Sequence, residues 1–327
     1  FSGVFVGLTI TGQWVLSDVA HIPGGGLGLL LGIGFIFYFF KPGKVSFDRP
    51  STVHGWVRRC HEVLENFEYL LEYEEQSEIK KERINSLQKI LDRGEDQNIG
   101  FLKTKEVNLP DKEQLEKVLG IKNQIKVSFP PALPVRDQSW ILPDLIQEKD
   151  FLVYSLVLPM SAADLLWIKN IPADQPAWLL VASNDSADWF EERNALEAQL
   201  PDRWNNRVLK WSGSETEMTT AFSPIKKLLE NPKKNTDITK QRLLSRLHAS
   251  WQKDLEKLRR EKFKVIQTRS QWIVAGVVFA SPVASTDLLA VAVVNGLMIK
   301  EMSKIWSCKM KPELLEAVSR QLAMAAV

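Results

Sequence analysis

The chain has 327 residues, of which 45% are apolar and 25% charged, as in an ordinary folded protein long enough for two domains. Its formal net charge of +2 gives no indication of a nucleic-acid partner. The two cysteines imply no disulfide framework and are compatible with a reducing compartment. Because the chain begins with Phe1 and stops in the apolar sequence LAMAAV, we expect it to be a fragment.

The first informative segment is IPGGGLGLLLGIGFIFYFFKPGK, residues 22–44. A phosphate-binding Walker A loop needs a glycine five residues before a Gly-Lys pair, and a Ser or Thr after the pair. Tyr38 stands five residues before Gly43, and Val45 follows Lys44, so the motif fails at both positions. Residues 22–40 carry no charge and predict a helix that crosses a membrane.

Small residues recur along one face of this predicted helix. These residues are Gly24, Gly28 and Gly32. Either they let another helix approach closely, or they only loosen the helix. Tyr38, Lys41 and Lys44 are typical of a membrane edge, and the positive-inside rule places the rest of the chain on the cytoplasmic side. Residues 1–20 are apolar but contain polar side chains, so they form either a second span or a helix in the interface.

A long helical pattern covers residues 52–92. Its heptad spacing predicts the seam of a coiled coil or of a helical hairpin, formed by Trp56, Cys60, Val63, Phe67 and Leu70. His54, Cys60 and His61 raise the question of a metal site. Because Cys60 and His61 point about 100° apart on a helix and no fourth ligand is near in sequence, we do not expect one.

From residue 99 to residue 230 the pattern alternates between strands and helices. Strands are predicted at IGFLK, NQIKVSF, DFLVYSLVLP, PAWLLVASND and RVLKWSG. Helices are predicted at DKEQLEKVLG, SAADLLWIKNI, ADWFEERNALEAQL and PIKKLLEN, with Ser161 as an N-cap and Gly120 as a terminator. This alternation predicts a doubly wound α/β domain.

This order of elements resembles a small GTPase-like domain, in which LLVASNDSAD stands where the family has its guanine-specificity motif. The resemblance implies vestigial nucleotide-pocket positions at Ser183, Asn184 and Asp185, although the lysine of the motif is absent. The sequence WSGS at residues 211–214 stands in place of the family's final loop. The loop after IGFLK lacks Gly-Lys-Ser, and PPALP replaces the family's Asp-x-x-Gly. Lacking groups for phosphates and Mg²⁺, the domain is interpreted as a degenerate GTPase fold that serves as a scaffold.

No catalytic constellation is evident elsewhere. The histidines are scattered at residues 21, 54, 61 and 248, and no Gly-x-Ser-x-Gly nucleophile elbow occurs. We therefore expect neither enzymatic activity nor a cofactor.

A second long helix is predicted after the linker and helix start NPKKNTDITKQ. Its apolar face comprises Leu243, Leu244, Leu247, Trp251, Leu255 and Leu258. Its basic face comprises Lys253, Lys257, Arg259, Arg260, Lys262 and Lys264. A basic face that leads into an apolar segment favours an anionic membrane surface, and the lack of interleaved aromatic residues argues against nucleic acid.

The apolar segment that follows begins near Trp272 and contains two runs, neither long enough to span a bilayer alone. A re-entrant hairpin, a pair of interfacial helices and a packed helical domain are all compatible with it, and Asp287 can cap the second helix. The sequence SPVASTDLLAVAVVNGLMIKEMSKIW resembles the YcjF-like family, whose C-terminal domain of unknown function commonly follows a GTPase-like domain. The matching residues are Pro282, Asp287, Asn295 and Met298.

These patterns predict five segments, which are a membrane anchor at 1–44, a helical stalk at 45–98, the α/β domain at 99–235, a basic amphipathic helix at 236–270 and a YcjF-like module at 271–327. The leading hypothesis is a membrane-anchored scaffold or assembly factor that binds lipid and another membrane protein. The resemblance implies the thylakoid or plasma membrane of a cyanobacterium. The alternatives are a dynamin-like remodelling oligomer that self-associates through its long helices, and a nucleotide-binding switch.

Overall fold

The computed structural model describes residues 49–71, 73–105, 107–120, 125–137, 139–182, 188–280 and 284–308. The predicted membrane span and the apolar segment before it lie outside these residues. The same is true of the residues predicted to pack or to mark the membrane edge there: Gly24, Gly28, Gly32, Tyr38, Lys41 and Lys44.

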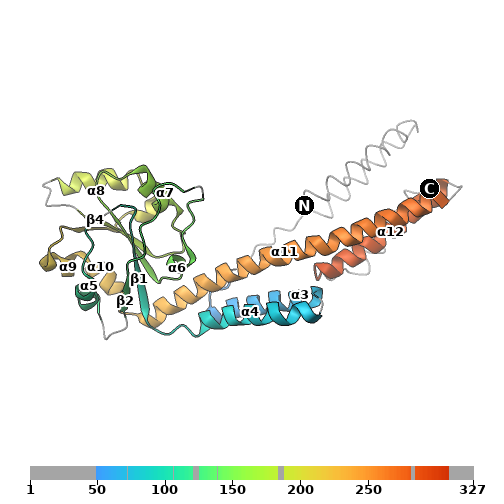
Figure 1. Cartoon of the computed structure of the whole chain (residues 1–327), viewed down its shortest axis with the longest axis horizontal. Coiled ribbons are helices and arrows are strands. Elements are labelled where there is room, and N and C mark those ends of the chain that lie inside the picture. The colour runs from blue at the N-terminus through green and yellow to red at the C-terminus, as the bar shows by residue number, and fades with distance from the viewer. Residues whose placement is uncertain are drawn as a thin grey trace. The chain divides into compact units, whose positions relative to one another are not determined.

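A five-stranded parallel sheet forms the centre of the α/β domain, in the order β2-β1-β3-β4-β5 (Figure 1). The strands are β1 (Gln97–Leu102), β2 (Ile125–Ser128), β3 (Phe151–Leu156), β4 (Ala177–Ala182) and β5 (Val208–Trp211). In the register of the sheet, Ile99 of β1 lies opposite Phe151 of β3, and Leu152 of β3 lies opposite Ala177 of β4. Every residue of β3 is buried, which explains why its sequence is almost continuously apolar.

Helices cover both faces of the sheet, so the prediction of a doubly wound α/β domain is confirmed (Figure 1). One face packs against α5 (Lys112–Leu119), α9 (Glu215–Ala221) and α10 (Ser223–Leu229). The other packs against α6 (Asp144–Gln147), α7 (Ala162–Asn170) and α8 (Trp189–Glu197). A short 3-10 helix, η1 (Asp202–Trp204), precedes β5 and buries Trp204 in the second core.

Local chemistry fixes the ends of several of these helices. Ser161 caps α7 as predicted, in a capping box in which its hydroxyl accepts from the amide of Asp164 and the Asp164 carboxylate accepts from the amide of Ser161. Gly120 ends α5 as predicted, because a Cβ at this position would collide with the carbonyl oxygen of Glu116.

The predicted helical pattern of residues 52–92 forms a hairpin of two helices, α3 (Val53–Leu70) and α4 (Tyr73–Leu91). Its partner is the long helix α11 (Pro232–Ala280), and the three helices share one apolar core. Trp56, Cys60, Val63 and Phe67 of the predicted seam are all buried in this core, where they meet Leu244, Trp251 and Leu255 of α11. The seam is therefore occupied within the chain itself.

The helix α11 is continuous from Pro232 to Ala280. The sequence NPKKNTDITKQ, expected to be a linker and helix start, is helical from Pro232 onward, and the predicted boundaries after residues 235 and 270 both fall within this helix. The hydrogen bond from Lys240 Nζ to the carbonyl oxygen of Leu91 (2.7 Å) contributes to holding this polar segment in place.

The last described helix, α12 (Ala284–Ile305), runs back along α11 as an antiparallel neighbour (Figure 1). Arg259 of α11 donates to the carbonyl oxygen of Ile305, and nearer the turn Arg269 pairs with Glu301. Of the described helices, none combines the length and the apolarity that a bilayer span requires.

Candidate functional site

The strand order of the sheet marks one place where a ligand is expected. In doubly wound folds with the order 2-1-3-4-5, ligands bind at the carboxyl ends of the strands, at the switch point between β1 and β3. The loops that follow these two strands therefore decide whether a nucleotide has room and partners.

In the helix that follows β1, amides of the first turn that a phosphate would use are already engaged. The carboxylate of Asp111, the N-cap of α5, accepts from the amides of Glu113 (3.0 Å) and Gln114 (3.2 Å). These are the groups with which a helix N-terminus normally binds an anion. Asp111 occupies them with a negative charge of its own, which also repels a phosphate.

A second segment lies against the loop that follows β1. The amide of Leu133 donates to the carbonyl oxygen of Lys103 (2.7 Å), and the indole of Trp167 donates to the carbonyl oxygen of Pro134 (2.9 Å). Leu133 is buried in the core beneath α7. The proline-rich loop after β2, predicted only as the replacement for a GTPase motif, thus closes over the carboxyl ends of β1 and β3.

A buried carboxylate, Asp164 of α7, lies beside this loop. Its Oδ1 accepts from the hydroxyls of Thr104 and Tyr154 (2.9 Å for Tyr154), and its Oδ2 accepts from the amide (3.1 Å) and hydroxyl (2.5 Å) of Ser161. Burial alone raises the pKa of Asp164, but the hydrogen bonds from Ser161, Thr104 and Tyr154 outweigh it and lower the pKa. Burial, and then the Asp164 charge, raise the pKa of Tyr154. Both carboxylate oxygens and all four donors are engaged with one another, so the cluster serves the fold.

No sequence pattern indicated this cluster, because Thr104 lies 60 positions before Asp164 and Tyr154 lies on a separate strand. The vestigial positions predicted instead, Ser183, Asn184 and Asp185, lie outside the described residues. The WSGS loop does follow β5, where Gly213 adopts a positive φ of 96° and Ser212 donates to Glu217 (2.6 Å).

Polar side chains are also concentrated at the opposite, amino edge of the sheet, where α11 meets the α/β domain. Arg242 donates to the carbonyl oxygens of Gln147 (2.8 Å) and Lys149 (2.7 Å). Asp150 is only 2% exposed and pairs with Arg93, which precedes β1, at 2.6 Å. Burial, followed by the charge of Arg246, lowers the pKa of Arg242 to about 10.

The structure exposes most residues of the predicted basic face of α11 and buries one of them. Lys253, Lys257, Arg260 and Lys264 are exposed, and Lys262 is half-buried. Arg259 is only 8% exposed, because it donates to the carbonyl oxygen of Ile305 (3.1 Å) and pairs with Glu256 (2.7 Å). Arg259 thus joins α11 to α12 and is not available to a lipid surface.

The predicted residues of the apolar segment lie on α11 and α12. Trp272 is 75% exposed, and Asn295 and Met298 are half-buried on α12. Asp287 is the fourth residue of α12, so it lies in the first turn rather than at the N-cap. Pro282 lies outside the described residues.

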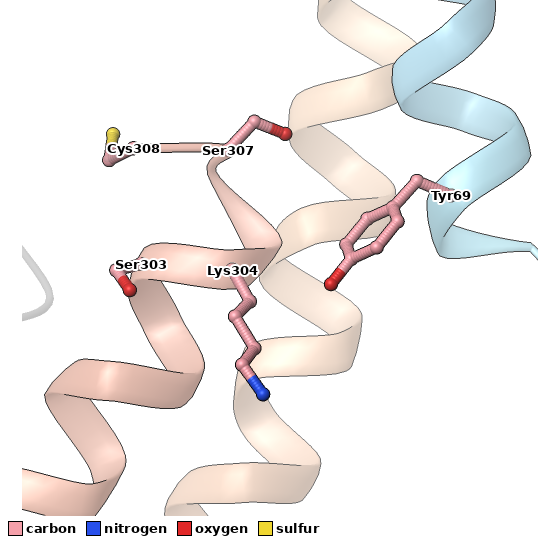
Figure 2. Close-up of a pocket in the computed structure, with 5 residues that line it drawn as sticks. All are labelled: Tyr69, Ser303, Lys304, Ser307 and Cys308. Carbon is pink, nitrogen blue, oxygen red and sulfur yellow. The ribbon is translucent and has the colours of Figure 1, made fainter. Parts of the chain in front are cut away.

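A shallow cavity of about 250 Å³ opens where the end of α12 meets the end of α3 (Figure 2). It is lined by Tyr69, Ser303, Lys304, Ser307 and Cys308. The Tyr69 ring extends from α3 toward the last turn of α12, which carries Lys304 (Figure 2). No sequence pattern pointed to this cavity, because its residues come from segments more than 200 positions apart.

The metal question raised by His54, Cys60 and His61 has a structural answer for the described part of the chain. No group of three or more His, Cys, Asp or Glu side chains there could hold an ion. Cys60 is buried in the bundle core, and burial raises the pKa of its thiol to about 12. Its surroundings are those of a packed apolar side chain.

These features define the class of protein to which the chain belongs: a doubly wound α/β domain joined to a helical bundle. The family model described as Domain of unknown function (DUF697) matches residues 242–327, and this domain is found in YcjF-like proteins. The match begins within α11 at Arg242 and includes α12. No curated protein is similar enough to the chain to count as a relative.

Proposed function

We propose that the chain is a non-catalytic scaffold or assembly factor that attaches to a membrane and binds a membrane-protein complex. Its α/β domain is a degenerate GTPase-like domain on the cytoplasmic side of that membrane. The membrane is the thylakoid or plasma membrane of a cyanobacterium. The observation that carries the proposal is the Asp111 carboxylate on the first amides of α5, where a nucleotide phosphate would have to bind. The loop through Leu133 and Pro134 adds to it by covering the neighbouring strand ends.

Attachment to a membrane is supported by two separate parts of the chain. Residues 22–40 are uncharged and of spanning length. The α11–α12 hairpin carries exposed aromatic side chains near its turn, with Trp272 at 75% and Phe279 at 92% exposure. Large exposed apolar side chains of this kind mark a surface that meets lipid or protein.

Binding of a protein complex is supported by the surface of the α/β domain. Three apolar side chains after β2 face solvent: Val135 (55%) and Ile141 (67%) in the segment between β2 and α6, and Leu145 (75%) on α6. The loop that carries Val135 and Ile141 is held by the hydrogen bonds of Leu133 and Trp167, and α6 is held in the core by Ile146, so all three side chains are presented on an ordered support. A rigid, exposed apolar surface suits a protein partner.

The remodelling oligomer is the weaker alternative. Such an oligomer would self-associate through the helices at residues 52–92 and 240–269, but the apolar seams of these helices pack against each other within one chain. Little apolar surface of those seams is left for a second copy.

Affinity purification of the tagged chain from gently solubilised membranes, followed by mass spectrometry, tests the proposal. A stoichiometric membrane complex is expected with the wild type. Leu145→Asp is expected to lose it, whereas Phe190→Asp on α8, a matched control of equal 75% exposure, is expected to retain it. Recovery of only the tagged chain would contradict the scaffold function, and calorimetric binding of GTP, GDP or ATP would favour a nucleotide switch.

A further inference from the structure

The cavity at the end of α12 has the chemistry of an anion site. Lys304 is exposed and makes no ion pair among the described residues. The carboxylates near it are engaged by other cations: Glu301 pairs with Arg269, Glu256 with Arg259 and Glu68 with Lys80. None of the five residues that line the cavity is acidic. The ammonium of Lys304 is therefore not neutralised locally.

The hydroxyls around Lys304 differ in what they can offer a ligand. Ser303 donates to the carbonyl oxygen of Lys300 (2.7 Å), and Ser307 donates to Asn66 (2.6 Å), so both protons are already used. Tyr69 is 62% exposed and makes no hydrogen bond through its hydroxyl among the described residues. Lys304 and Tyr69 are thus the donors that remain for an oxyanion, one from each wall of the cavity (Figure 2).

The position of the cavity on the hairpin suggests the source of that anion. Leu297 is 56% exposed and lies seven residues before Lys304, which corresponds to about 10 Å along a helix. Trp272 and Phe279 of α11 and Val293 of α12 are exposed farther toward the turn. If the hairpin enters the membrane by the end that carries these apolar side chains, and they reach about 5–10 Å below the headgroup boundary, a Lys about 10 Å behind them along the helix lies at the level of the lipid phosphates.

We infer that the cavity formed by Tyr69, Ser303, Lys304, Ser307 and Cys308 binds the phosphate of an anionic lipid headgroup. Lys304 supplies the charge, the Tyr69 hydroxyl supplies a hydrogen bond, and the end of the hairpin that carries Phe279 and Val293 lies in the acyl boundary. This inference rests on the proposed attachment to a membrane. It adds to that proposal a defined site with a preference for phosphate-bearing anionic lipid.

The cavity carries its own reporter, because Cys308 lines it and is exposed, whereas Cys60 is buried. The full chain is incorporated into nanodiscs of phosphatidylcholine alone or of phosphatidylcholine with phosphatidylglycerol, and labelling of Cys308 by an uncharged maleimide is timed. We expect labelling to be about fivefold slower with phosphatidylglycerol, the factor that one lysine near an anionic surface contributes. Lys304→Gln is expected to remove most of the slowing, and Tyr69→Phe part of it.

The control is Lys227→Gln on α10, an exposed lysine whose loss changes the net charge by the same amount. Lys227→Gln is expected to leave the slowing of Cys308 labelling by phosphatidylglycerol unchanged. A change in labelling that both variants show would therefore reflect the surface potential alone. Equal rates in both lipids for the wild type, or equal behaviour of the two variants, would overturn the headgroup site. Slowing by inorganic phosphate in uncharged micelles would show a free-anion site instead. Failure of the chain to enter nanodiscs would contradict membrane attachment itself.

Discussion

Arg242 of α11 donates a hydrogen bond to the carbonyl oxygen of Lys149, at 2.7 Å, across the junction between the helical bundle and the α/β domain. The same guanidinium reaches the carbonyl oxygen of Gln147, and Lys149 also accepts from the side chain of Gln175 (2.9 Å). The carbonyl groups that precede β3 are thus held by a helix that begins more than 80 residues later in the chain. This contact is one of the fixed points between the sheet and the segment that matches the family model.

The first prediction concerns this junction. Arg242→Met removes the charged donor from the carbonyl oxygens of Gln147 and Lys149 and leaves Lys149 with Gln175 alone, at a site where Arg242 itself is 4% exposed. We expect the free energy of unfolding to fall by about 3 kcal/mol, since hydrogen bonds to charged groups contribute about 1.5–3 kcal/mol and orphaned partners add to the loss. Urea denaturation followed by circular dichroism measures it.

Arg260→Met serves as the control for this change, because Arg260 lies exposed on the same helix. It is expected to alter stability by less than about 0.5 kcal/mol. An equally small effect of Arg242→Met would mean that the junction contributes nothing to holding the two parts together.

The sequence predicted the elements of this domain well, for a reason visible in β3 and β4. Both strands are covered on two faces, so their sequences are almost continuously apolar and need no knowledge of the partners. The caps were also predictable, because Ser161 and its partner Asp164 lie three residues apart. Signals of this kind are local.

The junction and the buried carboxylates could not be predicted in this way. Asp150 meets Arg93 from 57 positions away and Thr104 meets Asp164 from 60, and a single sequence contains no measure of such distances. Arg259 illustrates the same limit. Its spacing placed it on a basic surface, but the arrival of α12 buries it against Ile305.

A second prediction follows from the lowered pKa of Asp164. The folded state binds a proton at this carboxylate less readily than the unfolded state, so the network stabilises the fold at neutral pH and this contribution is lost as pH falls below about 4 through the folded pKa. Asp164→Asn is expected to cost about 2 kcal/mol at pH 7.

The difference in the free energy of unfolding between wild type and Asp164→Asn should become smaller as urea titrations are repeated from pH 5 toward pH 2.5. Asp144→Asn, at an exposed position on α6, is the matched control and should show a small gap at every pH. A gap for Asp164→Asn that stays constant with pH would contradict the assignment of the network to the ionised carboxylate.

A third prediction concerns the two thiols. Burial raises the pKa of Cys60 to about 12, so its thiolate is scarce at neutral pH and its sulfur is also shielded by α11. Cys308 is exposed. We expect a thiol reagent at pH 7.5 to modify one group in the folded chain and two after denaturation in urea.

Cys308→Ser identifies the reacting group, and it is expected to abolish labelling of the folded chain. Cys60→Ala is expected to leave that labelling unchanged while lowering stability by about 1 kcal/mol, because it removes a buried sulfur from the bundle core. Fast labelling of Cys60 in the folded chain would show that α3 separates readily from α11.

The fourth prediction concerns Asp111, whose carboxylate occupies the first amides of α5. Asp111→Ala removes the cap and is expected to lower the free energy of unfolding by about 1 kcal/mol, whereas Asp111→Asn keeps an acceptor oxygen and should cost only a few tenths of a kcal/mol.

The same pair of variants separates the charge from the cap in ligand binding. If the negative charge alone excludes a phosphate, calorimetry with GTP will detect binding to Asp111→Asn but not to the wild type. We expect no binding to either, because the loop through Leu133 and Pro134 still covers the neighbouring strand ends and no glycine-rich loop follows β1. Binding to both proteins would mean that the nucleotide site lies elsewhere in the domain and that its degeneration is only apparent.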